Sequence, residues 1–229
     1  MNRFLVGVSV CGVVALLAGS AHAYILIDNF EEGVVNIAAG PAVGAPTGWV
    51  LSVETGLSPA NTIGGNRTTA VYGWQTDWTS AQLIGGAMRF HLDNDLDYAA
   101  SLRYEGLGGV ALPGDGMAFD IQYDPNAGSN DAAFARLTLT DTSGRSASTG
   151  LMAGLSFDDN AVSGTYEFVF DRLSGSIVDL SSVNRIELSF TAGFDVARVA
   201  IDNIRAVPEP PTLALLALSG LGRLRRKKA

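Results

Sequence analysis

Cysteine, histidine and lysine are nearly absent from the central part of this 229-residue chain. The single cysteine, Cys11, lies in an apolar stretch at the N-terminus, and both lysines lie among the last three residues. The central chain therefore has no disulfide and no cysteine metal site. His91 is the one histidine beyond residue 22, so a zinc site and a Ser-His-Asp triad find little support.

The N-terminus has the three-part pattern of a secretory signal peptide. Arg3 supplies a positive start, Phe4–Leu17 is almost wholly apolar, and Ala21 and Ala23 place small residues before a cleavage point. We therefore predict that residues 1–23 form a signal helix that signal peptidase removes after Ala23. The alternative is a retained membrane anchor, but the apolar run is short for a span of about 20 residues.

The C-terminus carries a second apolar and basic segment. A Pro-Glu-Pro triplet ends the preceding strand, because proline removes a backbone donor and fixes φ. An apolar stretch follows from Leu213 to Leu221, and a basic cluster closes the chain, which favours a cytoplasmic position for that end. The residues expected to carry this signal are Pro208, Glu209, Pro210, Arg225 and Arg226.

This order of triplet, short apolar helix and basic end resembles the PEP-CTERM sorting signal. The resemblance implies a Gram-negative source that makes exopolysaccharide, and an exosortase that recognises and removes the tail, residues 208–229. The apolar stretch is shorter than the family's usual helix and is broken by Ser219 and Gly220. We therefore expect transient association with the inner membrane rather than permanent anchoring. The alternative is a basic tail on an ordinary C-terminal helix.

The central segment, residues 24–207, is long enough for one domain with a two-layer core. It holds nine arginines and 22 acidic residues, a net charge of −13. Such acidity argues against nucleic-acid binding, which needs a basic surface. It is typical of a soluble secreted protein, and it leaves carboxylates available for calcium.

Apolar and polar residues alternate with a period of two along much of this segment, the pattern of half-buried strands. Glycine-rich and Asp-Pro turns separate these stretches, and no stretch shows sustained helical periodicity. About ten strands are expected, in an all-β antiparallel β-sandwich of the jelly-roll type. The inward-facing residues expected from the alternation include Phe119, Ile121, Tyr123, Leu137, Leu139, Phe168, Phe170, Ile186, Leu188 and Phe190.

The two ends of the domain carry the most distinctive motifs. Leu26–Gly33 opens it as Leu-Ile-Asp-Asn-Phe-Glu-Glu-Gly, and Val199–Arg205 closes it as Val-Ala-Ile-Asp-Asn-Ile-Arg. These motifs resemble the galactose-binding-like jelly rolls, which include many carbohydrate-binding modules and whose first and last strands are neighbours. The resemblance would bring Asp28, Glu31 and Asp202 together as ligands of a structural calcium ion. The alternative is that Asp202 caps its strand and Asp28 is solvated.

Aromatic residues supply a candidate ligand surface. Tyr72, Trp74 and Trp78 share one face if their segment stays extended, and sugar rings stack on exposed aromatic rings. The alternative is that this face belongs to the core, where large aromatic residues usually lie. Trp49 is expected in the core.

The favoured function is that of a non-enzymatic exported protein, at the cell surface or in the extracellular matrix and associated with exopolysaccharide. One alternative is a carbohydrate-binding module with a defined glycan site. A second is a small glycoside-active enzyme, since glycosidases need only two carboxylates. The expected partners are the secretion machinery, signal peptidase, an exosortase and a polysaccharide, with no cofactor beyond calcium.

Overall fold

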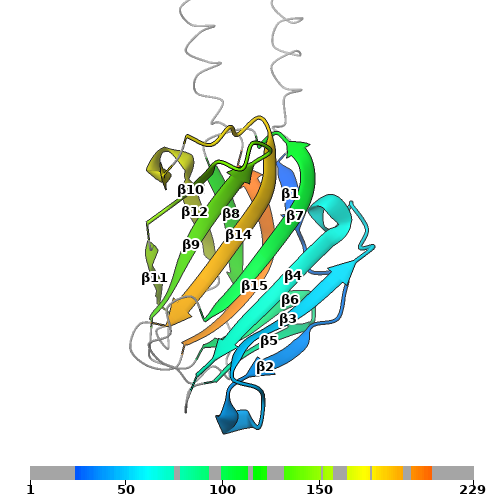
Figure 1. The fold of residues 1–229 in the computed structure, drawn as a ribbon, viewed down its shortest axis with the longest axis vertical. Helices are drawn as coiled ribbons and strands as arrows, with labels where there is room; N and C mark the ends of the chain where they lie inside the picture. The colour runs from blue at the N-terminus through cyan, green and yellow to red at the C-terminus, as the bar shows by residue number, and fades with distance from the viewer. Residues whose placement is uncertain are drawn as a thin grey trace, which may run out of the picture.

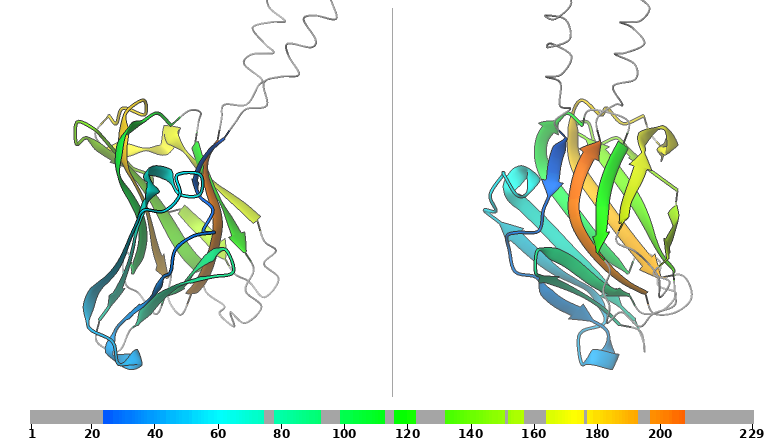
Figure 2. Two further views of the ribbon diagram at one scale, coloured as in Figure 1. Left: turned by 90° about the vertical axis from the view of Figure 1, so that its right-hand side faces the viewer. Right: turned by 180° about the vertical axis from the view of Figure 1, so that it is seen from behind.

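The computed structural model describes residues 24–74, 78–92, 99–112, 116–122, 132–150, 152–156, 164–175, 177–192 and 197–207. These residues form two antiparallel β-sheets packed face to face, which confirms the predicted β-sandwich (Figures 1 and 2). Three short 3-10 helices connect strands: η1 (Pro41–Val43), η2 (Ile63–Gly65) and η3 (Phe170–Arg172). No helix in the described ranges has the length and apolarity to cross a membrane.

The seven-stranded sheet has the order β12-β8-β15-β6-β5-β2, and β1 also pairs with β15. Its strands are β1 (Ile25–Asp28), β2 (Asn36–Ala39), β5 (Thr79–Ile84), β6 (Ala87–Leu92), β8 (Gly116–Gln122), β12 (Gly164–Val169) and β15 (Ala197–Val207).

The eight-stranded sheet has the order β13-β10-β9-β14-β7-β4-β3, and β11 also pairs with β9. It is the nearer sheet in Figure 1. Its strands are β3 (Gly48–Thr55), β4 (Asn66–Gly73), β7 (Ala100–Val110), β9 (Ala132–Asp141), β10 (Ser146–Ser148), β11 (Met152–Ser156), β13 (Ser174–Gly175) and β14 (Val183–Ala192).

The described residues contain fifteen strands rather than the expected ten or so. The difference comes mainly from strands of two to five residues, such as β1, β10 and β13, which are too short to show a period of two. The predicted signal helix, its cleavage residues Ala21 and Ala23, and the tail helix all lie outside the described residues.

The core lies between the sheets and follows the alternation read from the sequence. Leu137 and Leu139 of β9, and Ile186, Leu188 and Phe190 of β14, are fully buried as predicted. Phe119 of β8 and Phe168 of β12 pack with tilted rings from the other sheet, 5.4 Å between centroids. Because successive strand residues point to opposite faces, the residues between the buried ones point outward.

The first and last strands are hydrogen-bonded neighbours, which confirms the placement expected of the two end motifs. Ile25 of β1 pairs with Ala206 of β15, and Leu26 pairs with Arg205. Figure 2 shows the two strands side by side in the view from behind, β1 in blue and β15 in orange. The first and last strands of the described domain therefore lie next to each other in the same sheet.

Candidate functional site

The carboxylate of Asp28 is buried and held by other protein groups. Arg67 Nη1 donates to Asp28 Oδ2 at 2.9 Å, and the Tyr104 hydroxyl donates to the same oxygen at 3.0 Å. The Phe30 amide and the Thr62 hydroxyl donate to Asp28 Oδ1 at 2.8 and 3.3 Å. Burial raises the pKa of Asp28, and the Arg67 charge and the hydrogen bonds offset part of that rise. Asp28 therefore has a structural role in the core of the sandwich.

Arg67 is the centre of this buried cluster. Its Nε donates to Glu54 Oε2 at 2.8 Å, its Nη2 donates to the Glu32 carbonyl at 2.9 Å, and its guanidinium lies 5.3 Å from the ring centroid of Phe30. Gly33 has φ of +102°, and a Cβ there would collide with the Glu54 carboxylate. Residues of the opening motif therefore surround the Arg67 side chain. We call the whole set the Arg67 cluster, and its members are Asp28, Phe30, Glu32, Gly33, Glu54, Arg67 and Tyr104.

The other two proposed calcium ligands lie apart from this carboxylate. Glu31 is exposed, and its Oε1 lies beside Gly86 in the β5–β6 turn. Asp202 lies opposite Asp120 in the β15–β8 register, where its charge raises the pKa of Arg205 after larger contributions from Asp120. No group of three potential metal-ligating acids, histidines or cysteines occurs among the described residues. Calcium binding stays a prediction.

The three proposed ligand aromatics do not form one face, because their segment does not run on as a single strand. Tyr72 ends up in β4 of the eight-stranded sheet, where its ring lies 5.3 Å from that of Trp49. Trp78 lies just before β5 of the other sheet, where it stacks on His91 at 3.9 Å. Trp74 is half exposed, so the core interpretation does not hold for it.

Trp49 is not in the core, and this expectation was wrong. Trp49 is 51% exposed, and its outward-facing neighbours on β3, Leu51 and Val53, are 55% and 66% exposed. The physical reason is the alternation of side chains along β3: Val50 packs against the core, so the odd-numbered residues face outward. An exposed apolar row of this kind is typical of an interaction surface.

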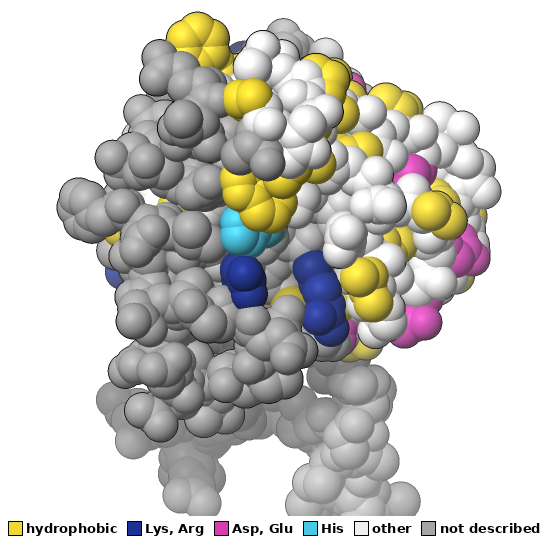
Figure 3. All heavy atoms as spheres, turned by 90° about the horizontal axis from the view of Figure 1, so that it is seen from below, with side chains coloured by type: hydrophobic (Ala, Val, Ile, Leu, Met, Phe, Trp, Pro, Cys, Tyr) yellow, Lys and Arg dark blue, Asp and Glu magenta, His cyan; other side chains and the backbone are white. Residues whose placement is uncertain are grey.

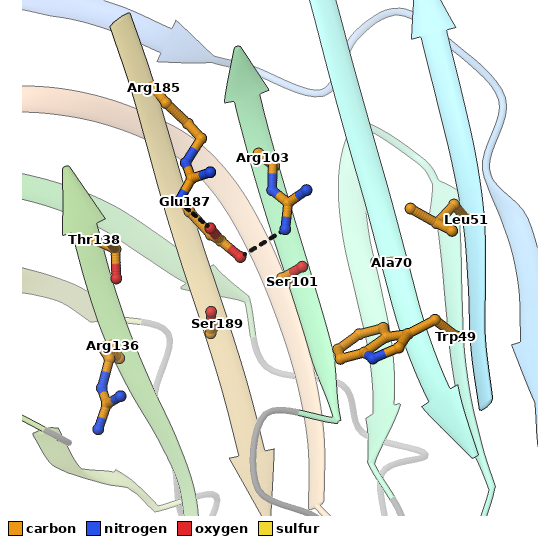
Figure 4. Close-up of a pocket in the computed structure, with 10 residues that line it drawn as sticks. All are labelled: Trp49, Leu51, Ala70, Ser101, Arg103, Arg136, Thr138, Arg185, Glu187 and Ser189. Carbon is orange, nitrogen blue, oxygen red and sulfur yellow. Dashed lines mark hydrogen bonds and ion pairs between the residues drawn. The ribbon is translucent and has the colours of Figure 1, made fainter. Parts of the chain in front are cut away.

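An open hollow on the outer face of the eight-stranded sheet has a volume of about 620 Å³, within the range of ligand sites. We call it the sheet-face cavity, and Figure 4 shows it with Trp49 at one side and Arg136 at the other. Its lining residues come from five adjacent strands and are Trp49, Leu51, Ala70, Ser101, Arg103, Arg136, Thr138, Arg185, Glu187 and Ser189.

The strand register arranges these side chains in rows across the sheet. One row consists of Leu51, Ala70, Ser101, Ser189 and Arg136. The next row consists of Val53, Thr68, Arg103, Glu187 and Thr138. The side chains in the middle of the first row are small, and the rows on both sides of it contain larger side chains. The first row therefore forms the floor of a trough. Five strands spaced by ~4.8 Å give it a length of about 19 Å.

Two arginines and two glutamates form an ionic network along one side of the trough. Arg103 Nη2 donates to Glu187 Oε1 at 3.1 Å, and Arg185 Nη2 lies 3.4 Å from Glu187 Oε2 (Figure 4). Glu105 lies farther away, with its Oε1 3.7 Å from Arg103 Nε and 3.8 Å from Arg185 Nη1. The Nε atoms of Arg103 and Arg185 are buried and have no hydrogen-bond acceptor.

A smaller pocket, of about 190 Å³, lies on the outer face of the seven-stranded sheet. His91 lies in its wall between Trp78 and Arg198, whose Nε donates to His91 Nδ1 at 3.2 Å. Burial, with a further effect of the Arg198 charge, lowers the pKa of His91 to about 4. Figure 3 shows this end of the molecule, where a histidine, basic side chains and a hydrophobic side chain gather. We call this smaller pocket the His91 pocket.

Sequence reasoning missed most of the sheet-face cavity. It did not single out Arg103, Arg136, Arg185 or Glu187. The first and last of these, Arg103 and Glu187, are hydrogen-bonded although they lie 84 positions apart in the chain. The one available signal was the alternation in β7, β9 and β14, where a polar or charged residue follows each buried one. That alternation identifies the outward face, but it does not show which outward faces lie side by side.

Comparison with known proteins identifies the tail. Residues 206–228 match the PEP-CTERM protein-sorting motif, as predicted. The chain is therefore an exported protein with a C-terminal sorting tail. A search of curated proteins found no match to this chain.

Similar solved structures include carbohydrate-binding modules with β-sandwich folds. The family 11 module of a cellulosomal cellulase from Clostridium thermocellum is 15% identical, with 82% of this chain and 96% of that one covered and a TM-score of 0.39. A xylan-binding module of family 15 is 9% identical, with 71% and 100% covered and a TM-score of 0.44. An agarase is 13% identical over 57% of this chain, which spans only 22% of the agarase, with a TM-score of 0.43. At these TM-scores the likeness says nothing of what this chain binds.

Proposed function

We propose that this exported protein is non-enzymatic, that it binds a polysaccharide chain in the sheet-face cavity, and that it works at the cell surface or in the extracellular matrix. The observation that carries the proposal is the trough itself. Trp49 offers a half-exposed ring beside a floor of small residues, and arginine, serine and threonine side chains line the rest. Aromatic rings stack on the apolar faces of sugars, while polar groups orient the hydroxyls.

The sorting motif supports the place of action. Signal peptidase would remove residues 1–23 during export, and an exosortase would recognise Pro208–Pro210 and remove the tail. Transient association with the inner membrane through the tail belongs to this proposal, as does an exopolysaccharide as the natural ligand. A protein that is released into, or displayed against, an exopolysaccharide layer meets extended sugar chains, which suit a long open trough better than a closed pocket.

The cavity favours binding over catalysis. Glycoside hydrolysis uses two carboxyl groups on opposite sides of the scissile bond. Among the described residues that line the cavity, Glu187 is the one acid, and Arg103 donates a hydrogen bond to it. Glu105 lies on the neighbouring strand, diagonal to Glu187, so the two acids share one side of the trough. A small glycoside-active enzyme is therefore the weaker candidate.

Binding of the purified protein to a panel of soluble polysaccharides, measured by affinity electrophoresis and calorimetry, tests the proposal. Trp49→Ala should weaken binding about tenfold or more, because it removes the stacking ring, and Trp49→Phe should retain much of it. Melting temperatures of both variants control for folding. Equal binding by Trp49→Ala and the wild type would contradict the proposal.

Two further variants test the prediction made from the sequence. Trp74→Ala and Trp78→Ala remove half-exposed or partly exposed rings that do not line the sheet-face cavity. Loss of binding in either of them, with Trp49→Ala unaffected, would move the glycan site to another surface. Calcium remains a separate proposal, and a shift of the melting temperature on addition of EDTA is its measure.

A further inference from the structure

The sheet-face cavity is basic in a protein whose central segment is strongly acidic. Residues 24–207 contain nine arginines, no lysine and 22 acidic residues. Three of those nine arginines, Arg103, Arg136 and Arg185, line this cavity together with a single carboxylate, that of Glu187. A ligand recognised only through hydroxyl groups needs no such concentration of positive charge, whereas a ligand that carries carboxylates does.

The geometry of two of these arginines leaves donor capacity for an incoming acid. Arg103 and Arg185 share the Glu187 carboxylate, one oxygen each, so neither forms a two-pronged pair with it. The Nε of Arg103 lies 3.7 Å from Glu105 Oε1, beyond hydrogen-bond distance, and the buried Nε of Arg185 also lacks an acceptor. The two side chains are nevertheless 32% and 35% exposed, so their terminal N–H groups can donate to a carboxylate or hydroxyl oxygen of a ligand.

The buried Arg67 shows that this openness is not general in the molecule. Its guanidinium donates to Asp28, Glu54 and the Glu32 carbonyl at 2.8–2.9 Å, and its side chain has no exposed surface. Arg103 instead lies in the row next to the floor of the trough, Arg185 lies in the row beyond it, and Arg136 lies at the far end of the floor (Figure 4). A sugar chain that lay along the floor would pass all three.

We propose that the polysaccharide bound in the sheet-face cavity is a polyuronate, a chain whose sugars carry carboxylates that Arg103, Arg136 and Arg185 pair with while Trp49 stacks on a ring. This inference rests on the proposed function. The net charge of −13 opposes binding of any polyanion, so attraction must come from this local cluster. The glutamates of the network keep the arginines apart and oriented in the absence of a ligand.

The test compares each polyuronate with its own carboxyl-reduced form, which keeps the linkage and removes the charge. Polygalacturonate, alginate and hyaluronan serve as probes, each in both forms, with the purified protein at low and at physiological salt. We expect at least one native polymer to bind about tenfold or more tightly than its reduced form. Arg185→Gln and Arg103→Gln should remove that preference, and Arg185→Lys should retain part of it.

A matched control comes from an arginine elsewhere on the surface. Arg172 is exposed in η3 and does not line the cavity, so Arg172→Gln makes the same change of charge and should leave the preference intact. Polyglutamate controls for attraction to any polyanion, and equal binding to it would overturn the inference. Equal binding to native and reduced polymers, with loss in Trp49→Ala, would overturn the inference and leave the proposed function standing. Binding to none of the polymers would contradict both.

Discussion

Two arginine networks in this molecule use the same residue types for different purposes. In the Arg67 cluster the side chains of Arg67 and Asp28 are fully buried, the hydrogen bonds are near 2.9 Å, and each nitrogen of the guanidinium has an acceptor. In the network of the sheet-face cavity the two arginines are 32% and 35% exposed, the ion pairs lengthen to 3.8 Å, and two Nε atoms lack acceptors. The comparison teaches that a network in which every arginine nitrogen has an acceptor stabilises the fold. A network beside a cavity in which some nitrogens lack acceptors can bind a ligand.

The largest effect is expected when Arg67 is removed. Arg67→Met leaves the Asp28 carboxylate buried without its counter-charge, and breaking a buried pair in this way costs about 3–5 kcal/mol. Urea unfolding measures the change. If Arg67→Met does not fold, Asp28→Asn serves as the second variant, and a loss below about 0.5 kcal/mol for a folded Arg67→Met protein would show that the cluster does not hold the fold.

A smaller loss is expected when one hydrogen bond of the same cluster is removed. Tyr104→Phe keeps the ring in the core and deletes the hydroxyl that donates to Asp28, so it should cost about 1.5–3 kcal/mol, the value of a hydrogen bond to a charged group. The measurement is the shift of the urea midpoint at constant slope. A Tyr104→Phe protein as stable as the wild type would show that water or another donor replaces the hydroxyl.

The His91 pocket lies between the two extremes, because its histidine is partly buried. The folded pKa of His91, about 4, lies below the ordinary value of 6.5, so the unfolded chain binds its proton first as pH falls. The stability that neutral His91 contributes is complete above pH 6.5 and should be lost between pH 6.5 and about 4. His91→Gln should flatten the melting temperature over this window. An identical slope in both proteins would contradict the assignment, and Trp78 fluorescence reports the same step.

The smallest effect on stability is expected at the cavity. Arg185→Gln removes partly exposed ion pairs at 3.4 and 3.8 Å, which are worth between 0 and about 1 kcal/mol. Its effect on glycan binding should nevertheless be large. A loss of stability as great as that of Arg67→Met, measured in the same urea titration, would erase the distinction between the two networks.

Removal of the tail is a separate expectation from the sorting motif. The intact mass of the protein recovered outside the cell should lack residues 1–23 and the basic end, and Glu209→Ala should slow this processing if the triplet is read by the protease. Exported protein that keeps Arg225 and Arg226 would contradict tail removal. The control is the mass of the same protein in cells that lack the processing enzyme.

Local pattern was enough to predict the sandwich and its core. The period of two in β9 and β14 identified Leu137, Leu139, Ile186 and Leu188 as inward-facing, because alternation follows directly from the pleat. The neighbouring placement of the first and last strands also followed from the two end motifs, although through resemblance rather than through physics.

Contacts between distant segments could not be predicted in the same way. Asp28 appeared to be a metal ligand in the sequence, and its actual partner, Arg67, lies 39 residues away on the other sheet. Trp49 looked like a core residue, because nothing in the local pattern shows that β3 is an edge strand with its odd-numbered face outward. Register and sheet order, which decide both cases, depend on the packing of the whole domain.

A crystal structure of the protein with an oligosaccharide from a polymer that it binds tests the central claim most directly. The account predicts sugar rings along the floor formed by Ala70, Ser101 and Ser189, with one ring stacked on Trp49 and an acidic group beside Arg103 or Arg185. Sugar rings bound instead at the His91 pocket, with the sheet-face cavity empty, would contradict it.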